Sequence, residues 1–154
     1  MPRLEPGQPA PDFALPSDEG GVVRLSDLRG ERVVVYFYPR DDTSGCTVEA
    51  CEFRDANDDF AAAGARVLGV SPDPAGSHQR FRAKHGLTFT LLSDGDHAVA
   101  EAYGVWVEKS MYGRTYMGIE RSTFVIGPDG VVEQALYRVK PRGHAAAVLA
   151  GLRP

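Results

Sequence analysis

The sequence has only two cysteines among its 154 residues, and it lacks a basic excess and long apolar runs. Two cysteines are too few for the disulfide framework of a small secreted protein. The 17 basic residues are scattered and outnumbered by 21 acidic ones, which argues against nucleic acid or a membrane surface as a partner. Neither a run of about 18 apolar residues nor the apolar core of a signal peptide is found. We therefore expect a cytoplasmic protein.

The overall composition is that of an ordinary globular protein. Hydrophobic residues make up 43% of the chain and charged residues 25%. A chain of this length can bury a core without disulfides or metal ions. We expect a single domain over residues 1–154.

The first half of the chain predicts a strand followed by a helix. Residues 33–38, Val-Val-Val-Tyr-Phe-Tyr, are β-branched and aromatic without polar alternation, which is typical of a strand buried on both faces. Residues 46–63 then read as a helix ended by Gly64. Before the strand, the proline-rich residues 6–16 predict an edge strand, and a hairpin through residues 20–21 follows it.

The second half repeats strand and helix and then changes order. A strand at residues 66–70 and a helix carrying Phe81 and His85 imply a parallel sheet. The elements expected after them are a strand at 88–92, a helix at 98–103, a polar loop at 104–118, an antiparallel hairpin of 122–126 and 131–137, and a helix at 143–152. This connectivity predicts an α/β fold of the thioredoxin-like layered sandwich class, with a central mixed sheet flanked by helices and an N-terminal hairpin.

The spacing of the cysteines argues against two common cysteine chemistries. Cys46 and Cys51 form C-x4-C, whereas dithiol oxidoreductases use C-x-x-C, and a zinc site needs a second ligand pair. The histidines are dispersed, and no pair has the i, i+4 spacing of a helical metal site: they are His78, His85, His97 and His144. We expect neither a metal nor a bound cofactor.

Cys46 is placed where a strand ends and a helix begins. Free backbone N–H groups and the helix dipole favour a thiolate at a helix N-terminus. Four nearby acidic residues oppose it by like-charge repulsion: Asp41, Asp42, Glu49 and Glu52. A reactive thiolate at this position therefore needs a positively charged partner.

The segment around the cysteines resembles the peroxiredoxins, specifically their bacterioferritin-comigratory or Q-type branch. The family motif P-x-x-x-T-x-x-C is met by Pro39, Thr43 and Cys46, and the second cysteine of the branch by Cys51. The resemblance extends over nearly the whole chain, through residues 9–13, 91–94, 104–106 and 121–124. It implies a thioredoxin-fold thiol peroxidase, an antioxidant enzyme that reduces hydrogen peroxide and organic hydroperoxides.

The resemblance also implies a role for each site residue. Cys46 attacks the O–O bond and becomes a sulfenic acid, and Cys51 condenses with it to form a disulfide. Arg121 reaches the thiolate and the peroxide with donors that stay charged. Thr43 bonds the peroxide, and Pro39 shields the pocket from water. A thioredoxin or similar dithiol protein recycles the enzyme, and a monomer is expected.

Helix geometry constrains the disulfide step. Residues five apart on an ideal helix have Cα atoms about 8–9 Å apart. A disulfide needs Cα atoms within about 7 Å. If Cys46 and Cys51 lie on one helix, their disulfide requires at least one turn to unwind.

Two other functions remain open at the level of sequence. The chain could be a redox sensor or relay whose disulfide switches partner binding, and turnover would distinguish this from a peroxidase. It could also be a dithiol oxidoreductase acting on protein disulfides, although the C-x4-C spacing and the P-x-x-x-T-x-x-C pocket argue against it. Insulin reduction without peroxide would support that alternative.

Several site residues have plainer alternative roles. Cys51 could be inert, with an outside thiol as the resolving group, and Thr43 could be a helix N-cap. Arg121 could form a surface ion pair. Glu49 either orients Arg121 or stabilises the helix dipole, and it is not assigned to the catalytic set. Packing beneath the loop is favoured over lining a pocket for three aromatic residues: Trp106, Tyr112 and Tyr116.

Overall fold

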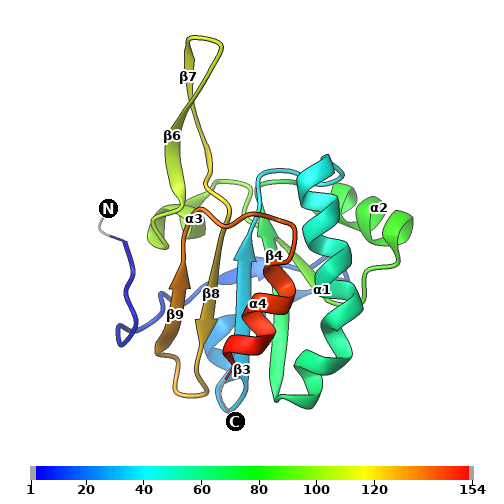
Figure 1. The fold of residues 1–154 in the computed structure, drawn as a ribbon, viewed down its shortest axis with the longest axis vertical. Coiled ribbons are helices and arrows are strands. Elements are labelled where there is room, and N and C mark those ends of the chain that lie inside the picture. The colour runs from blue at the N-terminus through cyan, green and yellow to red at the C-terminus, as the bar shows by residue number, and fades with distance from the viewer. Residues whose placement is uncertain (1–2, 153–154) are drawn as a thin grey trace.

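The computed structural model describes residues 3–152 and is built around a five-stranded mixed sheet (Figure 1). Met1, Pro2, Arg153 and Pro154, which belong to the expected 1–154 domain, lie outside the described residues. The strand order is β5-β4-β3-β8-β9. The bounds are β3 (Arg32–Phe37), β4 (Ala65–Ser71), β5 (Thr90–Ser93), β8 (Ser122–Ile126) and β9 (Val132–Leu136).

Strand β3 lies at the centre of this sheet, as the apolar run predicts. It pairs in parallel with β4 and antiparallel with β8. Val34 and Tyr36 pack into the apolar cluster on one face, and Val35 and Phe37 into the cluster on the other. A strand with a core on both sides requires apolar residues at consecutive positions.

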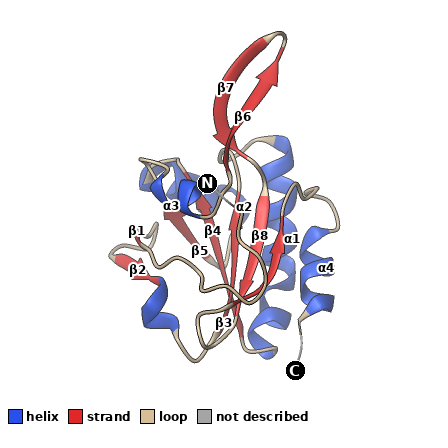
Figure 2. Ribbon diagram, turned by 90° about the vertical axis from the view of Figure 1, so that its left-hand side faces the viewer, coloured by secondary structure: helices blue, strands red, loops and turns tan. Residues whose placement is uncertain are grey.

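Helices cover both faces of the sheet. One face packs against α1 (Ser44–Ala62), α2 (Ala75–His85) and α4 (His144–Gly151). The other face packs against α3 (Ala98–Ala102) and the N-terminal segment (Figure 2). No described helix is long and apolar enough to span a membrane. The mixed sheet flanked by helices agrees with the architecture that the sequence predicts.

The predicted N-terminal hairpin is confirmed. Strands β1 (Ala14–Pro16) and β2 (Val22–Arg24) pair antiparallel. Gly20 and Gly21 form the turn with φ angles of 93° and 74°. Because these angles lie in the left-handed region, glycine suits both positions.

The loop predicted at residues 104–118 is wrong. The structure has a second hairpin there, made of β6 (Trp106–Met111) and β7 (Arg114–Ile119), which projects from the body of the protein (Figure 1). Tyr112 and Gly113 form the two-residue turn with φ angles of 52° and 77°. Hairpin turns favour Asn or Asp before Gly, so tyrosine gives no turn signal. The strands are also largely exposed and lack clear apolar alternation.

The packing predicted for the aromatic residues of this segment is wrong for two of them. The exposed fractions of Tyr112 and Tyr116 are 98% and 44%, so neither is buried beneath a loop. Trp106 stacks on His97, with ring centroids 3.9 Å apart and planes 2° apart. Residues 106–118 are all exposed or partly exposed, so the tyrosines of the hairpin lie at the surface with their neighbours.

Gly69 of β4 allows the Tyr36 ring to pack closely against the strand. A Cβ at position 69 would lie 2.9 Å from Leu91 Cδ2 and 3.0 Å from the Tyr36 hydroxyl. We expect Gly69→Ala to lower the free energy of unfolding by about 1–3 kcal/mol, as overpacking of a core does. Urea unfolding measures this change. The control is Gly95→Ala, since no heavy atom of the described residues outside its own chain neighbours would lie within 4 Å of the added Cβ; equal stability of the two variants would contradict the prediction.

Candidate active site

Cys46 lies in the first turn of α1, beyond the end of the central strand. It is the third residue of the helix, and its exposed fraction is 1%. Thr43 is the N-cap residue but makes no side-chain capping bond. The first N–H groups of a helix have no partner within the helix, and together with the helix dipole they stabilise negative charge nearby. The predicted position of this thiol at a helix start is confirmed.

Arg121 is the positive partner that the sequence requires. Its Nη2 atom lies 3.2 Å from Cys46 Sγ, and its Nη1 atom donates to Glu49 Oε1 at 2.6 Å. Burial alone would lower the pKa of Arg121, but the charges of Glu49 and Cys46 and their hydrogen bonds raise it above its ordinary value. The guanidinium therefore stays charged while it bridges a thiol and a carboxylate.

Gly45 leaves the space that this guanidinium occupies. A Cβ at position 45 would lie 3.3 Å from Arg121 Nη2 and 3.3 Å from Pro141 Cγ. A side chain before Cys46 would therefore crowd the bridging group. In the sequence this glycine reads only as part of a loop.

Glu49 is a buried residue of the site that the sequence does not assign to the catalytic set. Its exposed fraction is 0%, and its Oε2 atom has no hydrogen-bond partner among the described residues. Burial raises the pKa of Glu49 to about 7, although Arg121 opposes the shift. Its position one turn after Cys46 supports an orienting role toward Arg121 and places a titrating group between the two cysteines.

His144 is a second residue near Arg121 that the sequence gave no reason to select. Its Nε2 lies 2.6 Å from Thr123 Oγ1. Burial lowers the pKa of His144 to about 4, and the charge of Arg121 acts in the same direction. The ring is therefore neutral near pH 7 and leaves Arg121 as the cation at Cys46 Sγ.

The other acidic residues near Cys46 also have partners. The Asp42 carboxylate contacts Lys84 Nζ at 2.7 Å and His85 Nε2 at 3.0 Å. Glu52 Oε1 accepts a hydrogen bond from the backbone N–H of Gly143 at 2.8 Å. Asp41 pairs with His78. The repulsion expected from these residues is thus compensated locally.

The structure brings the remaining motif residues near the start of α1 but not onto Sγ. The Thr43 hydroxyl donates to the Arg40 carbonyl at 3.2 Å. Pro39 is half-buried in the same loop. Cys51 lies on α1 with Cys46, is partly exposed, and carries a free thiol as Cys46 does. Both cysteines therefore lie on one helix, which is the arrangement in which their disulfide requires the helix to unwind.

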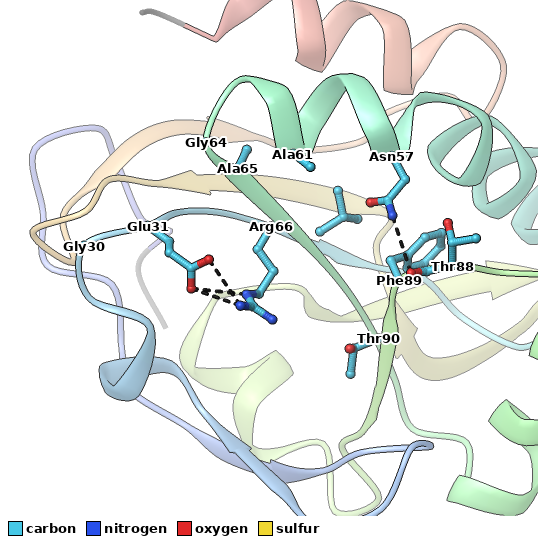
Figure 3. Close-up of a pocket in the computed structure, with 11 residues that line it drawn as sticks. Gly30, Glu31, Asn57, Ala61, Gly64, Ala65, Arg66, Thr88, Phe89 and Thr90 are labelled. Carbon is cyan, nitrogen blue, oxygen red and sulfur yellow. Dashed lines mark hydrogen bonds and ion pairs between the residues drawn. The ribbon is translucent and has the colours of Figure 1, made fainter.

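A cavity of about 400 Å³ lies at the opposite end of the sheet (Figure 3). It opens where β3, β4 and β5 begin, whereas Cys46 follows the end of β3. A bidentate ion pair of Arg66 with Glu31 lies in its lining, and Asn57 donates to the Thr88 carbonyl there. This cavity is not part of the thiol site.

Comparison with known proteins gives one consistent result. The family model described as the AhpC/TSA family matches residues 6–135. The chain is 51% identical over 149 residues to a putative peroxiredoxin bcp of Coxiella burnetii, covering 97% of this chain and 99% of that protein. It is 48% identical over 150 residues to peroxiredoxin Bcp of Bacillus subtilis, covering 97% and 96%.

Solved structures agree with this result. Peroxiredoxin Q of Xanthomonas campestris matches with a TM-score of 0.87 and 48% identity, covering 91% of this chain and 89% of that one. A PrxQ mutant of Xylella fastidiosa matches with a TM-score of 0.93 and 39% identity, covering 99% and 97%. These matches confirm the predicted thioredoxin-like α/β fold.

The bridging geometry predicts that charge alone cannot replace Arg121. Lysine keeps the charge but lacks the fork that reaches Cys46 and Glu49 together. We expect the rate of Cys46 oxidation by peroxide to fall about tenfold in Arg121→Lys and about 100-fold in Arg121→Met. Stopped-flow fluorescence or competition kinetics measures these rates. Equal rates in the lysine variant and the parent would show that the fork is not needed.

The burial of Glu49 predicts that opening of the first turns of α1 depends on pH. The pKa of Glu49 is about 7 in the folded site and 4.5 ordinarily, so the folded site binds the proton more tightly. Protonated Glu49 therefore stabilises the folded segment. This stabilisation is fully present below about pH 4.5 and is lost as pH rises through 7. We expect the opening constant of residues 46–51 to rise on the order of tenfold between pH 5.5 and 7.5.

Amide hydrogen exchange of Cys51→Ser, corrected for intrinsic exchange rates, measures this opening. In Cys51→Ser/Glu49→Gln the carboxylate is replaced by an uncharged amide of similar shape, so the added pH dependence should disappear. A pH dependence that is the same in both proteins would rule out Glu49 as its source.

Proposed function

The chain belongs to the AhpC/TSA family and is a peroxiredoxin of the Bcp/PrxQ type, and we propose that it reduces hydrogen peroxide and organic hydroperoxides through Cys46. The observation that carries this proposal is the contact of 3.2 Å between Arg121 Nη2 and the buried Cys46 Sγ at a helix start. A similar protein, the bacterioferritin comigratory protein of Xanthomonas campestris, is described with alkyl peroxide reduction activity. That likeness supports organic hydroperoxides as substrates.

The first step is a displacement on the peroxide. The Cys46 thiolate attacks one oxygen, an S–O bond forms and the O–O bond breaks. The leaving oxygen takes a proton and departs as water or an alcohol, which leaves a sulfenic acid on Cys46. Arg121 contacts Sγ through one nitrogen, and its other N–H groups can bind the peroxide oxygens.

Thr43 and Pro39 complete the proposed pocket. Thr43 is exposed at the N-cap of α1, two positions before Gly45, where a turn of its side chain would release the Arg40 carbonyl and present the hydroxyl to a bound peroxide. Pro39 has no N–H group, so its half-buried ring can exclude water without offering a competing donor. The roles of both residues come from the family motif that they match.

The second step joins the two cysteines. The Cys51 thiol attacks the sulfenic sulfur, water leaves and a disulfide forms. Since both residues lie in α1 (Ser44–Ala62), their Cα atoms are about 8–9 Å apart in an ideal helix, farther than a disulfide allows. The start of α1 must therefore unwind after each oxidation.

A dithiol protein then restores the thiols. The unwound segment exposes the disulfide, and a thioredoxin or a similar protein attacks one of its sulfurs. We infer a single-domain monomer that acts in the cytoplasm, where such reductants keep thiols reduced, and that uses no bound cofactor.

Peroxide consumption with a thioredoxin and its reductase tests this function. We expect many turnovers in the parent protein and none in Cys46→Ser, because the serine hydroxyl is not an effective nucleophile at neutral pH. In Cys51→Ser we expect a trapped sulfenic acid, which dimedone labelling and mass spectrometry detect. A parent protein that forms one disulfide and then stalls with every reductant would favour the sensor alternative instead.

A further inference from the structure

Asp41 is a buried carboxylate in the loop that leads to Cys46. Its side chain is 3% exposed. It accepts hydrogen bonds from the Tyr38 hydroxyl at 2.6 Å and the Ser77 hydroxyl at 2.7 Å, and His78 Nδ1 lies 2.7 Å away. Burial alone would raise the pKa of Asp41, but the bonds from His78 and Tyr38 and the His78 charge lower it. The carboxylate is therefore ionised and acts only as an acceptor.

His78 faces acceptors at both ring nitrogens. Nδ1 contacts the Asp41 carboxylate, and Nε2 lies 3.0 Å from the Leu92 carbonyl oxygen. A neutral imidazole has one N–H, so satisfying both acceptors requires both nitrogens to be protonated. The side chain is 0% exposed, so bulk solvent does not reach either contact. The hydrogen-bond geometry thus indicates a buried imidazolium–carboxylate pair.

This pair fixes the loop to three other parts of the fold. Ser77 and His78 belong to α2, and Leu92 belongs to β5. The backbone N–H of Asp41 donates to Asp73 Oδ2 at 2.6 Å, in the segment between β4 and α2. The same loop carries Pro39 and Thr43, so the pair anchors the segment that holds these two residues.

The Asp41 charge also lies in the environment of the reacting thiol. The buried Tyr36 hydroxyl has its pKa raised by burial and then by the charges of Glu49, Cys46 and Asp41. The Tyr38 ring, whose hydroxyl donates to Asp41, packs 5.4 Å from the Tyr36 ring between centroids, and both rings belong to the buried cluster that contains Cys46. An uncompensated carboxylate in this low-dielectric region would disfavour the Cys46 thiolate.

We propose that His78 is a positioning residue of the peroxidase: its imidazolium holds and neutralises the Asp41 carboxylate, and thereby fixes the active-site loop and protects the Cys46 thiolate from repulsion. The proposal rests on the proposed function in one respect, that Cys46 is the reacting thiol. The charged or titratable groups facing Cys46 are Arg121, Glu49, Lys109 and Tyr36, and those facing Asp41 are Tyr38, His78 and Asp73.

The test measures the alkylation of Cys46 by iodoacetamide against pH, in a Cys51→Ser background. His78→Asn keeps an N–H donor for Asp41 but removes the charge. We expect alkylation at pH 6 to be about tenfold slower than in the parent and to converge with it at high pH, because the thiolate fraction falls when the carboxylate is uncompensated. Removing that carboxylate as well, in Asp41→Asn/His78→Asn, should restore the rate to within about twofold.

His85→Asn is the matched control. His85 lies on the same helix and contacts the neighbouring Asp42, but that carboxylate is 43% exposed. Solvent screens exposed pairs, so we expect less than about a twofold change. A slow double variant, or a His78→Asn variant that matches the parent at pH 6, would overturn the proposal.

Nitrogen-15 NMR of the parent protein tests the imidazolium independently of any variant. We expect both His78 ring nitrogens to be protonated at pH 7, and a ring with one proton would overturn the proposal even if His78→Asn did not fold. Alkylation and NMR do not require peroxide turnover. A protein that alkylates as expected but does not turn over peroxide would contradict the proposed function and leave the His78 assignment standing.

Discussion

The guanidinium of Arg121, shared by a buried thiol and a buried carboxylate, is the interaction on which the site depends. Arg121 is 75 residues from Cys46 in sequence, yet their contact is 3.2 Å. The register of the sheet explains this proximity, because Phe37 at the end of β3 pairs with Ser122 at the start of β8. The chain leaves β3 toward Cys46 and enters β8 from Arg121 at the same end of the sheet. The antiparallel pairing of these two core strands therefore places the guanidinium next to the thiol.

The need for a thiolate at Cys46 also explains why the acidic residues around it are paired locally. The protein has a net charge of -4, and four acidic residues lie within six positions of Cys46. Two of them, Asp41 and Glu49, are buried, and each contacts one basic side chain, His78 and Arg121 respectively. A buried charge without a partner is costly, so these pairs let an acidic segment surround a site that needs a thiolate.

The sequence predicts the parts of the site whose chemistry is local. The apolar run of β3, the helix start at Cys46 and the final hairpin are visible because each has its own residue pattern. Glu49 and His144 are not visible in this way, because their surroundings come from distant elements. Arg121 contacts Glu49, its charge lowers the pKa of His144, and Thr123 of β8 lies within hydrogen-bond distance of the His144 ring. The β6–β7 hairpin has no such residue pattern, because its strands pair with each other and bury little apolar surface.

The structure also limits how far α1 can unwind. Phe53, two residues after Cys51, is fully buried and stacks on Tyr36 of the central strand, with ring centroids 4.6 Å apart. Its ring also packs against His144 on α4. Unwinding from Ser44 through Cys51 exposes Glu49 and Ala50, but extending it past Phe53 would break the aromatic core. The turns that must open thus lie between a loop fixed at Asp41 and a helix fixed at Phe53, which confines the rearrangement to the segment that carries both thiols.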